Sequence, residues 1–418
     1  MKCRLCSAPL TEVFLDLGSA PLSNAFLREE DLRRAESHYP LRLFHCAQCR
    51  LVQLDDAERA EVIFGADYAY FSSFSRSWLA HAERFVAQAA RELGLGSTSR
   101  VIEVASNDGY LLQYVKARGI PCLGIEPTAS TAAVARGRGI ETIEEFLGRE
   151  SGRRIAAARG PADLVVGNNV LAHVPDLSDF VAGLAQLLSP SGALSLEFPH
   201  LLRMVRENQF DTVYHEHFSY FSLHAVQRAL SAQGLALWHV EELPTHGGSL
   251  RAWARHAAAG VPARESVFGV LAAERDAGML EAAFYQGFQA QADRVKDDFL
   301  AFLIEQRRAG RRVAGYGAAA KGNTLLNYAG VRPDLLQFVV DASPHKQGRF
   351  LPGSRIPIVD EERLRAERPD FVVLLPWNLR EELSAQLAYV GEWGGRLVVA
   401  VPSLQILPPL SPRERGRG

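Results

Sequence analysis

The chain of 418 residues is long enough for two or three domains with their own cores, because 47% of its residues are hydrophobic. Its 46 Lys and Arg nearly balance its 48 Asp and Glu, and the formal net charge is −2. This balance gives no basic field that would attract nucleic acid, and no apolar run is long enough to span a bilayer. The start MKCRLCSAPL lacks a signal-peptide core. We therefore expect a cytoplasmic, monomeric protein without a nucleic-acid or membrane partner.

Two Cys-x-x-Cys pairs lie near the N-terminus. Disulfides are rare in the cytoplasm, and a redox role would need only one pair. Four thiolates are instead the shell that a tetrahedral zinc ion prefers, and a closed site of this kind is structural. The expected zinc ligands are Cys3, Cys6, Cys46 and Cys49.

Hydrophobic periodicity next predicts a helix over 76–93, ended by Gly94. Short apolar runs that alternate with helical segments then indicate a parallel α/β sheet. The expected strands are 101–104, 121–126, 163–166 and 193–197. A long helical segment follows at 265–309. A second α/β unit then begins, with strands at 312–317, 338–341 and 371–375.

Small and polar residues follow the first of these strands, where the chain turns into a helix. Small residues let the backbone approach a ligand, and a helix start offers free N–H groups. Glu126 closes the next strand, from which its carboxylate can accept both hydroxyls of a ribose; the alternative is a surface acid at a strand end. These features predict an S-adenosylmethionine site formed by Glu103, Ala105, Asn107, Asp108, Gly109, Glu126, Asn168 and Asn169. We expect His173, in the same loop region, to pack beneath the cofactor.

The segment from Tyr214 to Ser222 concentrates two imidazoles, a carboxylate and several aromatic rings. Such groups can move protons near neutral pH, so a methyl acceptor would be activated here. The alternative is a capped helix start whose histidines are satisfied within the fold.

A glycine loop follows the strand at 312–317. It resembles a dinucleotide fingerprint with an incomplete glycine pattern. Its amides and Lys321 can instead hold a diphosphate, with Asn323 beside the same ligand. Arg251, after Gly247 and Gly248, is a second candidate for the diphosphate. The alternative is a remnant nucleotide-binding fold that serves as a lid.

Taken in order, these motifs resemble the sugar C-methyltransferases that act on nucleotide-linked 4-keto deoxyhexoses. The resemblance covers nearly the whole chain and includes four further segments, 67–75, 246–251, 315–324 and 341–352. It implies an α/β protein with a small N-terminal zinc-binding domain, a central Rossmann-like class I methyltransferase domain and a C-terminal Rossmann-like domain. The expected boundaries are 1–66, 67–260 and 261–405, with a disordered tail at 406–418.

The resemblance also implies a nucleotide-linked 4-keto sugar that lies between the central and C-terminal domains. A carbon beside a ketone becomes nucleophilic only after it loses a proton, so a base and an oxyanion donor are required. The family motif places the base at His217. We expect Glu216 to orient that imidazole or to hold the sugar, and Tyr214 to hydrogen-bond the oxyanion. Tyr68 fits the family's active-site tyrosine, with Tyr70 as the alternative register and a substrate contact.

Other functions fit parts of this pattern. In an O- or N-methyltransferase, His217 would deprotonate a hydroxyl or an amine. A non-catalytic sugar-nucleotide-binding protein, or an oxidoreductase that uses the C-terminal glycine loop, would not need the methyl donor.

Overall fold

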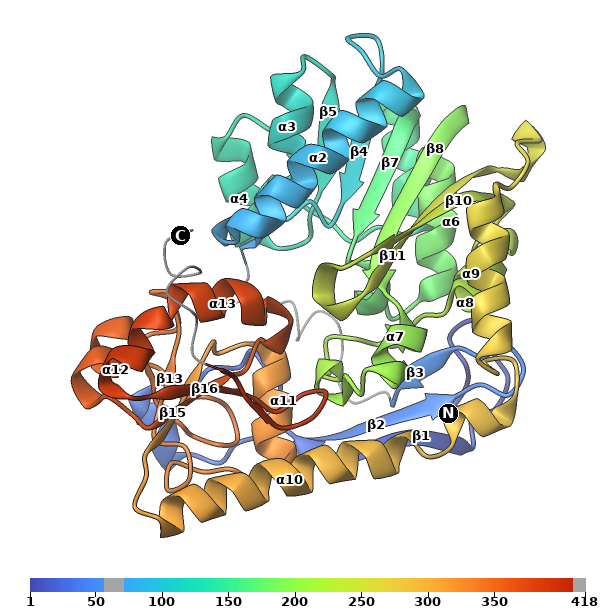
Figure 1. Ribbon diagram of the computed structural model, residues 1–418. Coiled ribbons are helices and arrows are strands. Elements are labelled where there is room, and N and C mark those ends of the chain that lie inside the picture. The colour runs from blue at the N-terminus through green and yellow to red at the C-terminus, as the bar shows by residue number, and fades with distance from the viewer. Residues whose placement is uncertain (56–70, 409–418) are drawn as a thin grey trace. The chain divides into compact units, whose positions relative to one another are not determined.

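The computed structural model describes residues 1–55 and 71–408. Two compact units interleave along the chain (Figure 1). The first unit comprises the described residues of 1–12, 45–202 and 216–284, and the second those of 13–44, 203–215 and 285–418. The motifs in the sequence instead predict consecutive domains, and those boundaries stay a prediction. The predicted junction at 66/67, Tyr68, Tyr70 and residues 409–418 of the expected tail lie outside the described residues.

The first unit is built on a seven-stranded sheet in the order β10-β11-β8-β7-β4-β5-β6. Strands β4 to β8 run parallel, whereas β11 pairs antiparallel with β8 and β10 pairs antiparallel with β11. The strands span Val101–Val104 (β4), Cys122–Ile125 (β5), Thr142–Ile143 (β6), Ala162–Asn168 (β7), Leu188–Pro199 (β8), Leu235–Leu243 (β10) and Ser249–His256 (β11). The predicted α/β class is confirmed, and the antiparallel hairpin at the edge is an addition to it.

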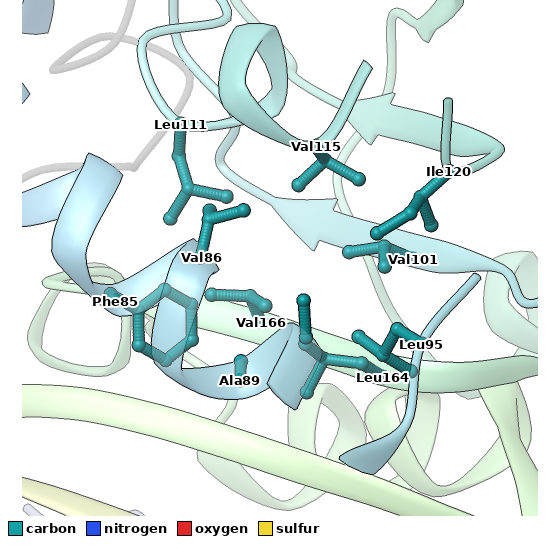
Figure 2. A pocket seen from close by; sticks show the side chains of 11 residues that line it. Phe85, Val86, Ala89, Leu95, Val101, Leu111, Val115, Ile120, Leu164 and Val166 are labelled. Atoms are coloured by element: carbon teal, nitrogen blue, oxygen red, sulfur yellow. The ribbon is translucent and has the colours of Figure 1, made fainter. Parts of the chain in front are cut away.

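The α-helices that the described residues place wholly in this unit are Arg76–Leu93 (α2), Leu112–Ala117 (α3), Ala129–Gly137 (α4), Arg149–Arg159 (α5), Leu177–Leu187 (α6), Leu223–Ser231 (α8) and Glu265–Asp276 (α9). Helix α2 has the predicted bounds, with Ser75 accepting a bond from the Trp78 amide at its start and Gly94 in the left-handed conformation at its end. Its apolar face, with Phe85 and Val86, packs on the sheet. Figure 2 shows this face and its neighbours around a small gap lined only by apolar side chains, which makes it a feature of core packing.

Two short strands complete the first unit. Strand β3 (Val52–Leu54) directly follows the second cysteine pair and pairs antiparallel with β9 (Ser219–Tyr220). Helix α7 (Leu201–Arg206) leads from the first unit into the second.

The second unit contains a six-stranded sheet in the order β14-β13-β12-β15-β16-β17, parallel except for the last pair. Its strands are Val313–Tyr316 (β12), Val339–Val340 (β13), Ile358–Val359 (β14), Phe371–Leu374 (β15), Arg396–Val399 (β16) and Gln405–Ile406 (β17). Its helices are Phe288–Arg308 (α10), Ala320–Tyr328 (α11), Glu361–Glu367 (α12) and Arg380–Gln386 (α13), and strands β1 (Glu12–Ala20) and β2 (Tyr39–His45) lie almost wholly in this unit.

The helical stretch predicted over 265–309 is two helices, α9 and α10. The chain between them contains Gly278 and Gly287, both with positive φ, which a continuing helix does not allow. Within residues 1–55 and 71–408, no helix combines the length and the apolar character needed to cross a bilayer.

Candidate functional site

The four predicted metal ligands meet in the first unit. The sulfur atoms of Cys3, Cys6, Cys46 and Cys49 all lie within 4.8 Å of one another. Three of these side chains are buried, and none of the four is in a disulfide. Four thiolates at this spacing are the donor set of a structural zinc site, so the predicted cluster is confirmed.

The two Cys-x-x-Cys pairs, Cys3/Cys6 and Cys46/Cys49, form the first and second knuckle, and both knuckles have the same backbone geometry. The amide of Ser7 donates to the carbonyl of Cys3 at 2.9 Å, and the amide of Arg50 donates to that of Cys46 at 2.9 Å. Ser7 and Arg50 both have positive φ, at 61° and 63°. This turn aims both sulfur atoms of a pair at one point.

Backbone strain gathers where β4 and β7 end. Ala105, Asn107 and Asn169 have φ values of 55°, 49° and 52°, a region that few non-glycine residues occupy. Gly109 has a φ of 78°, and a Cβ there would lie 2.5 Å from Ile140 Cδ1. The strained loops lie at the carboxyl ends of parallel strands, where α/β sheets bind their ligands.

Glu126 lies at the end of β5 and is 4% exposed. Its Oε2 accepts the amide of Asn107 at 2.8 Å, and its Oε1 accepts the amide of Thr128 at 2.9 Å. Burial raises the pKa of this carboxyl, while the hydrogen bonds from the two amides oppose that change. The remaining lone pairs of a carboxylate fixed in this way can accept ribose hydroxyls.

Asn107 and Asp108 hold the loop from the other side. Asn107 Oδ1 accepts the amide of Ser72 at 2.9 Å. The Asp108 carboxylate bonds the hydroxyl of Ser73, and Arg138 donates to the Asp108 carbonyl at 2.7 Å. The structure therefore gives these two predicted cofactor residues contacts that shape the loop.

Glu103 lies fully buried in β4, beneath the loop. Burial raises the pKa of its carboxyl well above the ordinary value, and the charges of Glu126 and Asp108 act in the same direction. Asn168, at the end of β7, is 7% exposed and donates to the Tyr110 hydroxyl at 3.5 Å. The residues predicted to bind the methyl donor thus gather at the ends of the neighbouring strands β7, β4 and β5.

His217 is half-buried in the first unit and lies among aromatic rings. Its ring centroid is 4.8 Å from that of His173 and 5.9 Å from that of Tyr220. Burial lowers the pKa of His173 to about 4, against a hydrogen bond to the backbone of Glu216. His173 is therefore neutral at physiological pH and presents no positive charge to His217.

The residues just before His217 in the sequence are divided between the two units. Glu216 is 5% exposed in the first unit, whereas Tyr214 belongs to the second unit. His215 is 1% exposed, and its Nε2 lies 3.1 Å from the carbonyl of Pro40, so this imidazole is packed within the second unit.

Arg251 is 2% exposed, in the interior of the first unit. Its guanidinium lies 2.7 Å from Glu197 and 3.5 Å from Glu241, and His81 lies 2.8 Å from the same oxygen of Glu197. Burial raises the pKa of Glu197, but the hydrogen bond from His81 and the charge of Arg251 outweigh it and lower that pKa to about 2. The predicted contact of Arg251 with a diphosphate stays a prediction, and the ion pairs give the side chain a structural function.

Sequence reasoning missed Glu197 and His81. Glu197 pairs with Arg251 across antiparallel strands β8 and β11. A cross-strand pair becomes visible only when the register is known, and the chain offers no turn signal that would have fixed it.

In the second unit, Lys321 and Asn323 lie at the start of α11. Lys321 Nζ donates to Asn378 Oδ1 at 2.6 Å and lies 4.7 Å from the Trp377 ring centroid. Burial lowers the pKa of Lys321 to about 8, although the nearby Asp211 raises it. Asn323 is 1% exposed, and its side-chain amide has no hydrogen-bond partner within the described part of the chain. Their predicted roles in substrate binding stay predictions.

Asp341 lies where a dinucleotide-binding fold carries its ribose-binding acid, and its carboxylate is hydrogen-bonded to the protein. Asp341 follows β13, and its Oδ2 accepts the amide of Ala318 at 2.8 Å and Lys346 at 3.3 Å. Its Oδ1 accepts the amide of Ser343 at 2.8 Å. These bonds fix the Asp341 carboxylate at the end of β13, as the amides of Asn107 and Thr128 fix that of Glu126 at the end of β5.

Three family models match the chain in the order of these sites. Residues 3–64 match a zinc binding domain, residues 78–240 a methyltransferase domain, and residues 244–402 a C-methyltransferase C-terminal domain.

Two relatives and one solved structure illustrate the similarity. The chain is 35% identical to C-methyltransferase NovU of Streptomyces niveus over 406 residues, which cover 97% of this chain and 96% of that protein. It is 30% identical over 123 residues to the ubiquinone biosynthesis O-methyltransferase of Pasteurella multocida (strain Pm70), covering 26% of this chain and 49% of that protein. The structure of magnesium protoporphyrin IX methyltransferase from Synechocystis PCC 6803 with bound SAH is 15% identical in sequence. The superposition covers 42% of this chain and 82% of that chain, with a TM-score of 0.34.

Proposed function

The chain belongs to the C-methyltransferase family and is an S-adenosylmethionine-dependent C-methyltransferase, and from this premise we propose its acceptor and its base. The proposed acceptor is a carbon adjacent to the 4-keto group of a nucleotide-linked deoxysugar. The proposed base is His217, which removes the proton from that carbon. The observation that carries the proposal is the ring environment of His217, half-buried between a neutral imidazole and a tyrosine.

The chemistry requires a proton acceptor near neutral pH. Removal of the α-proton leaves the C–H electron pair in an enolate, whose carbon would then take the methyl group as the methyl–sulfur bond of the donor breaks and S-adenosylhomocysteine leaves. Because His173 is neutral, it does not repel the imidazolium that forms when His217 takes this proton.

The other predicted catalytic residues receive supporting roles. Glu216 orients the His217 imidazole or holds the sugar, and Tyr214 donates a hydrogen bond to the enolate oxygen. Tyr68 is proposed as a second hydroxyl at the acceptor. Each hydroxyl would stabilise charge that develops only during proton removal.

The methyl donor, when bound, supplies an electrophilic methyl group. We propose that Glu126 accepts its ribose hydroxyls and that the loop from Ala105 to Gly109 holds it close to the backbone. Asn168 and Asn169 would line the methionine part. The strained backbone and the buried carboxylate support these assignments.

On the sugar-nucleotide side, we propose contacts from Lys321, Asn323, Tyr70 and Arg251. Asn323 has the clearest support, because its buried amide lacks a partner among the described residues. We also propose that the enzyme acts as a monomer.

Proton removal can be tested apart from methyl transfer. In deuterium oxide, with S-adenosylhomocysteine bound, the enzyme should exchange the α-proton of a 4-keto sugar nucleotide for deuterium. His217→Asn should abolish both this exchange and turnover, while calorimetry shows unchanged donor binding. His38→Asn, at an exposed histidine, is the control and should keep both activities.

The acceptor class is tested with labelled donor and a panel of 4-keto sugar nucleotides, followed by mass spectrometry. A new carbon–carbon bond supports the proposal. A labelled methyl group on oxygen or nitrogen would require another acceptor. Near-normal exchange in His217→Asn would require another base.

A further inference from the structure

Arg4 connects the first cysteine knuckle with the segment that carries His217. It lies between the metal ligands Cys3 and Cys6, and its guanidinium carbon is 5.0 Å from the centroid of the Phe218 ring. Its Nη1 also donates to the carbonyl of Pro175 at 3.0 Å. One side chain therefore contacts the residue after His217 and a residue two positions after His173.

Gln53 makes a second connection. It is fully buried, and its Oε1 accepts the backbone amide of Arg4 at 2.8 Å. Gln53 lies in β3, directly opposite Ser219 in β9. The backbone of the first knuckle is thus tied through one buried side chain to a residue two positions after His217.

The second knuckle leads directly into the same strand. The amide of Cys46 donates to the carbonyl of Leu51 at 2.9 Å, and β3 begins at the next residue. The amide of Leu54 then donates to the carbonyl of Phe218 at 3.0 Å. On its other side, the amide of Phe218 donates to the carbonyl of Ala172 at 2.7 Å. Phe218 is therefore fixed between the strand that follows the knuckle and the loop that carries His173.

We propose that the metal-binding knuckles position His217, and that Arg4 and Gln53 are the positioning residues through which they act. The proposal rests on the proposed role of His217 as the base. The knuckles hold Arg4 and β3 in place. The Arg4 guanidinium contacts the face of the Phe218 ring, and pairing with β3 fixes the register of β9. The zinc site therefore serves catalysis without touching a reactant.

The expected effect is on kcat rather than on donor affinity. A displacement of a catalytic group by about 1 Å can cost about 100-fold in rate. Arg4→Ala removes one of several restraints on Phe218, so we expect kcat to fall about tenfold. Arg4 and Gln53 are not among the residues proposed to hold the donor, so the donor Kd should change less than about twofold.

The test uses the metal-loaded full-length protein with Arg4→Ala, Gln53→Ala and the control Lys2→Ala, whose exposed side chain precedes the same ligand. Three quantities are measured: zinc per chain, donor Kd, and amide hydrogen exchange in the peptide spanning 216–222. We expect full zinc content in all variants, with faster exchange in this peptide and lower kcat only in the first two. Equal exchange and equal kcat in Arg4→Ala, Gln53→Ala and Lys2→Ala would overturn the proposal.

A double-mutant cycle covers the case in which Arg4→Ala loses zinc or unfolds. Arg4→Lys keeps the charge but loses the planar group over the ring, and Phe218→Leu removes the ring. The effect of Arg4→Lys on kcat should largely vanish in the Phe218→Leu background. Additive effects of the two substitutions on kcat would show that Arg4 does not act through the Phe218 ring. If His217→Asn keeps α-proton exchange, the base assignment fails. Hydrogen exchange over 216–222 still decides whether the knuckles order that segment.

Discussion

Three non-glycine residues with positive φ mark the candidate donor site. Ala105, Asn107 and Asn169 each accept a backbone conformation that costs about 1–3 kcal/mol. The Glu126 carboxylate offsets part of this strain, because it accepts the amide of Asn107. Removal of the Glu126 charge should therefore affect both the loop and the ligand.

Glu126→Gln should weaken donor binding about 10- to 100-fold, because hydrogen bonds to a charged acceptor contribute about 1.5–3 kcal/mol. The amide nitrogen of glutamine would also face a backbone N–H. Calorimetric titration with S-adenosylhomocysteine measures the effect. Glu141→Gln, an exposed acid in the same unit, is the control. Equal donor Kd values for Glu126→Gln and Glu141→Gln would remove Glu126 from the site.

Glu197 should make the stability of the first unit depend on pH. Its pKa is lowered from 4.5 to about 2, so its stabilising effect is complete above pH 4.5 and is lost as the pH falls towards 2. This shift corresponds to about 3 kcal/mol. Urea unfolding followed by tryptophan fluorescence should show this fall in wild type and a shallower fall in Glu197→Gln. Parallel curves for the two proteins would contradict the assignment.

The sequence allowed residues with a local signature to be predicted. The Cys-x-x-Cys spacing fixes the metal ligands, and Glu126 closes a recognisable strand. Arg251 is predicted from the sequence to bind an anion, and that role stays a prediction; its ion pairs with Glu197 and Glu241 were not predicted. Glu241 lies across the β10–β11 hairpin, whereas Glu197 lies in β8, 54 residues before Arg251, so no local pattern could reveal Glu197 as a partner.

At the level of elements, a buried carboxylate from α9 caps helix α8. Oε1 of Glu274 lies 2.8 Å from His200 Nε2 and accepts the amide of Leu223 at 2.5 Å. Oε2 accepts the amide of His224 at 3.0 Å. Helix α8 begins directly after the His217 segment, and Ser222 adds a side-chain cap at Ala225.

Glu274→Ala should lower the free energy of unfolding by about 3 kcal/mol, because it leaves buried donors without an acceptor. Thermal unfolding by calorimetry measures the loss. Asp276→Ala, at an exposed acid near the end of the same helix, should change stability by less than about 0.5 kcal/mol. Similar melting temperatures for Glu274→Ala and Asp276→Ala would show that the cap does not stabilise α8.

Predictability of the elements follows from their hydrophobic patterns. The buried parallel strand β15 reads as a continuous apolar run and β4 as an apolar run interrupted only by Glu103, and both could be placed within a residue or two. The hairpin of β10 and β11 could not be placed. Gly247 and Gly248, both with positive φ, mark its turn, but His246 also has a positive φ, and the five-residue connection does not by itself fix the register of the two strands.

At the scale of the molecule, the chain crosses between its two compact units several times. Residues 13–44 lie between the two cysteine pairs in the sequence but belong to the second unit. Composition and linker signals identify consecutive domains, whereas interleaving depends on long-range packing. This arrangement could not be read from the sequence.

The interleaving predicts that residues 261–405 do not fold stably when expressed alone. In the second unit, the Phe14 ring stacks on that of Phe288 at 5.1 Å, and the amide of Leu27 donates to the carbonyl of Phe350 at 2.9 Å. Trp377 donates to Asp211 at 2.8 Å. A fragment cut at the predicted boundary would expose the apolar faces that these contacts cover.

Fusion of residues 13–44 to the start of 285–408 through a flexible glycine-serine linker should restore much of the lost packing. Circular dichroism melting should then show a cooperative transition in the fused chain and none in the 261–405 fragment. The β-bridge between Leu27 and Phe350 supplies two backbone hydrogen bonds that the isolated fragment cannot replace. A fragment that melts as cooperatively as the fused chain would mean that residues 13–44 pack on an already complete fold.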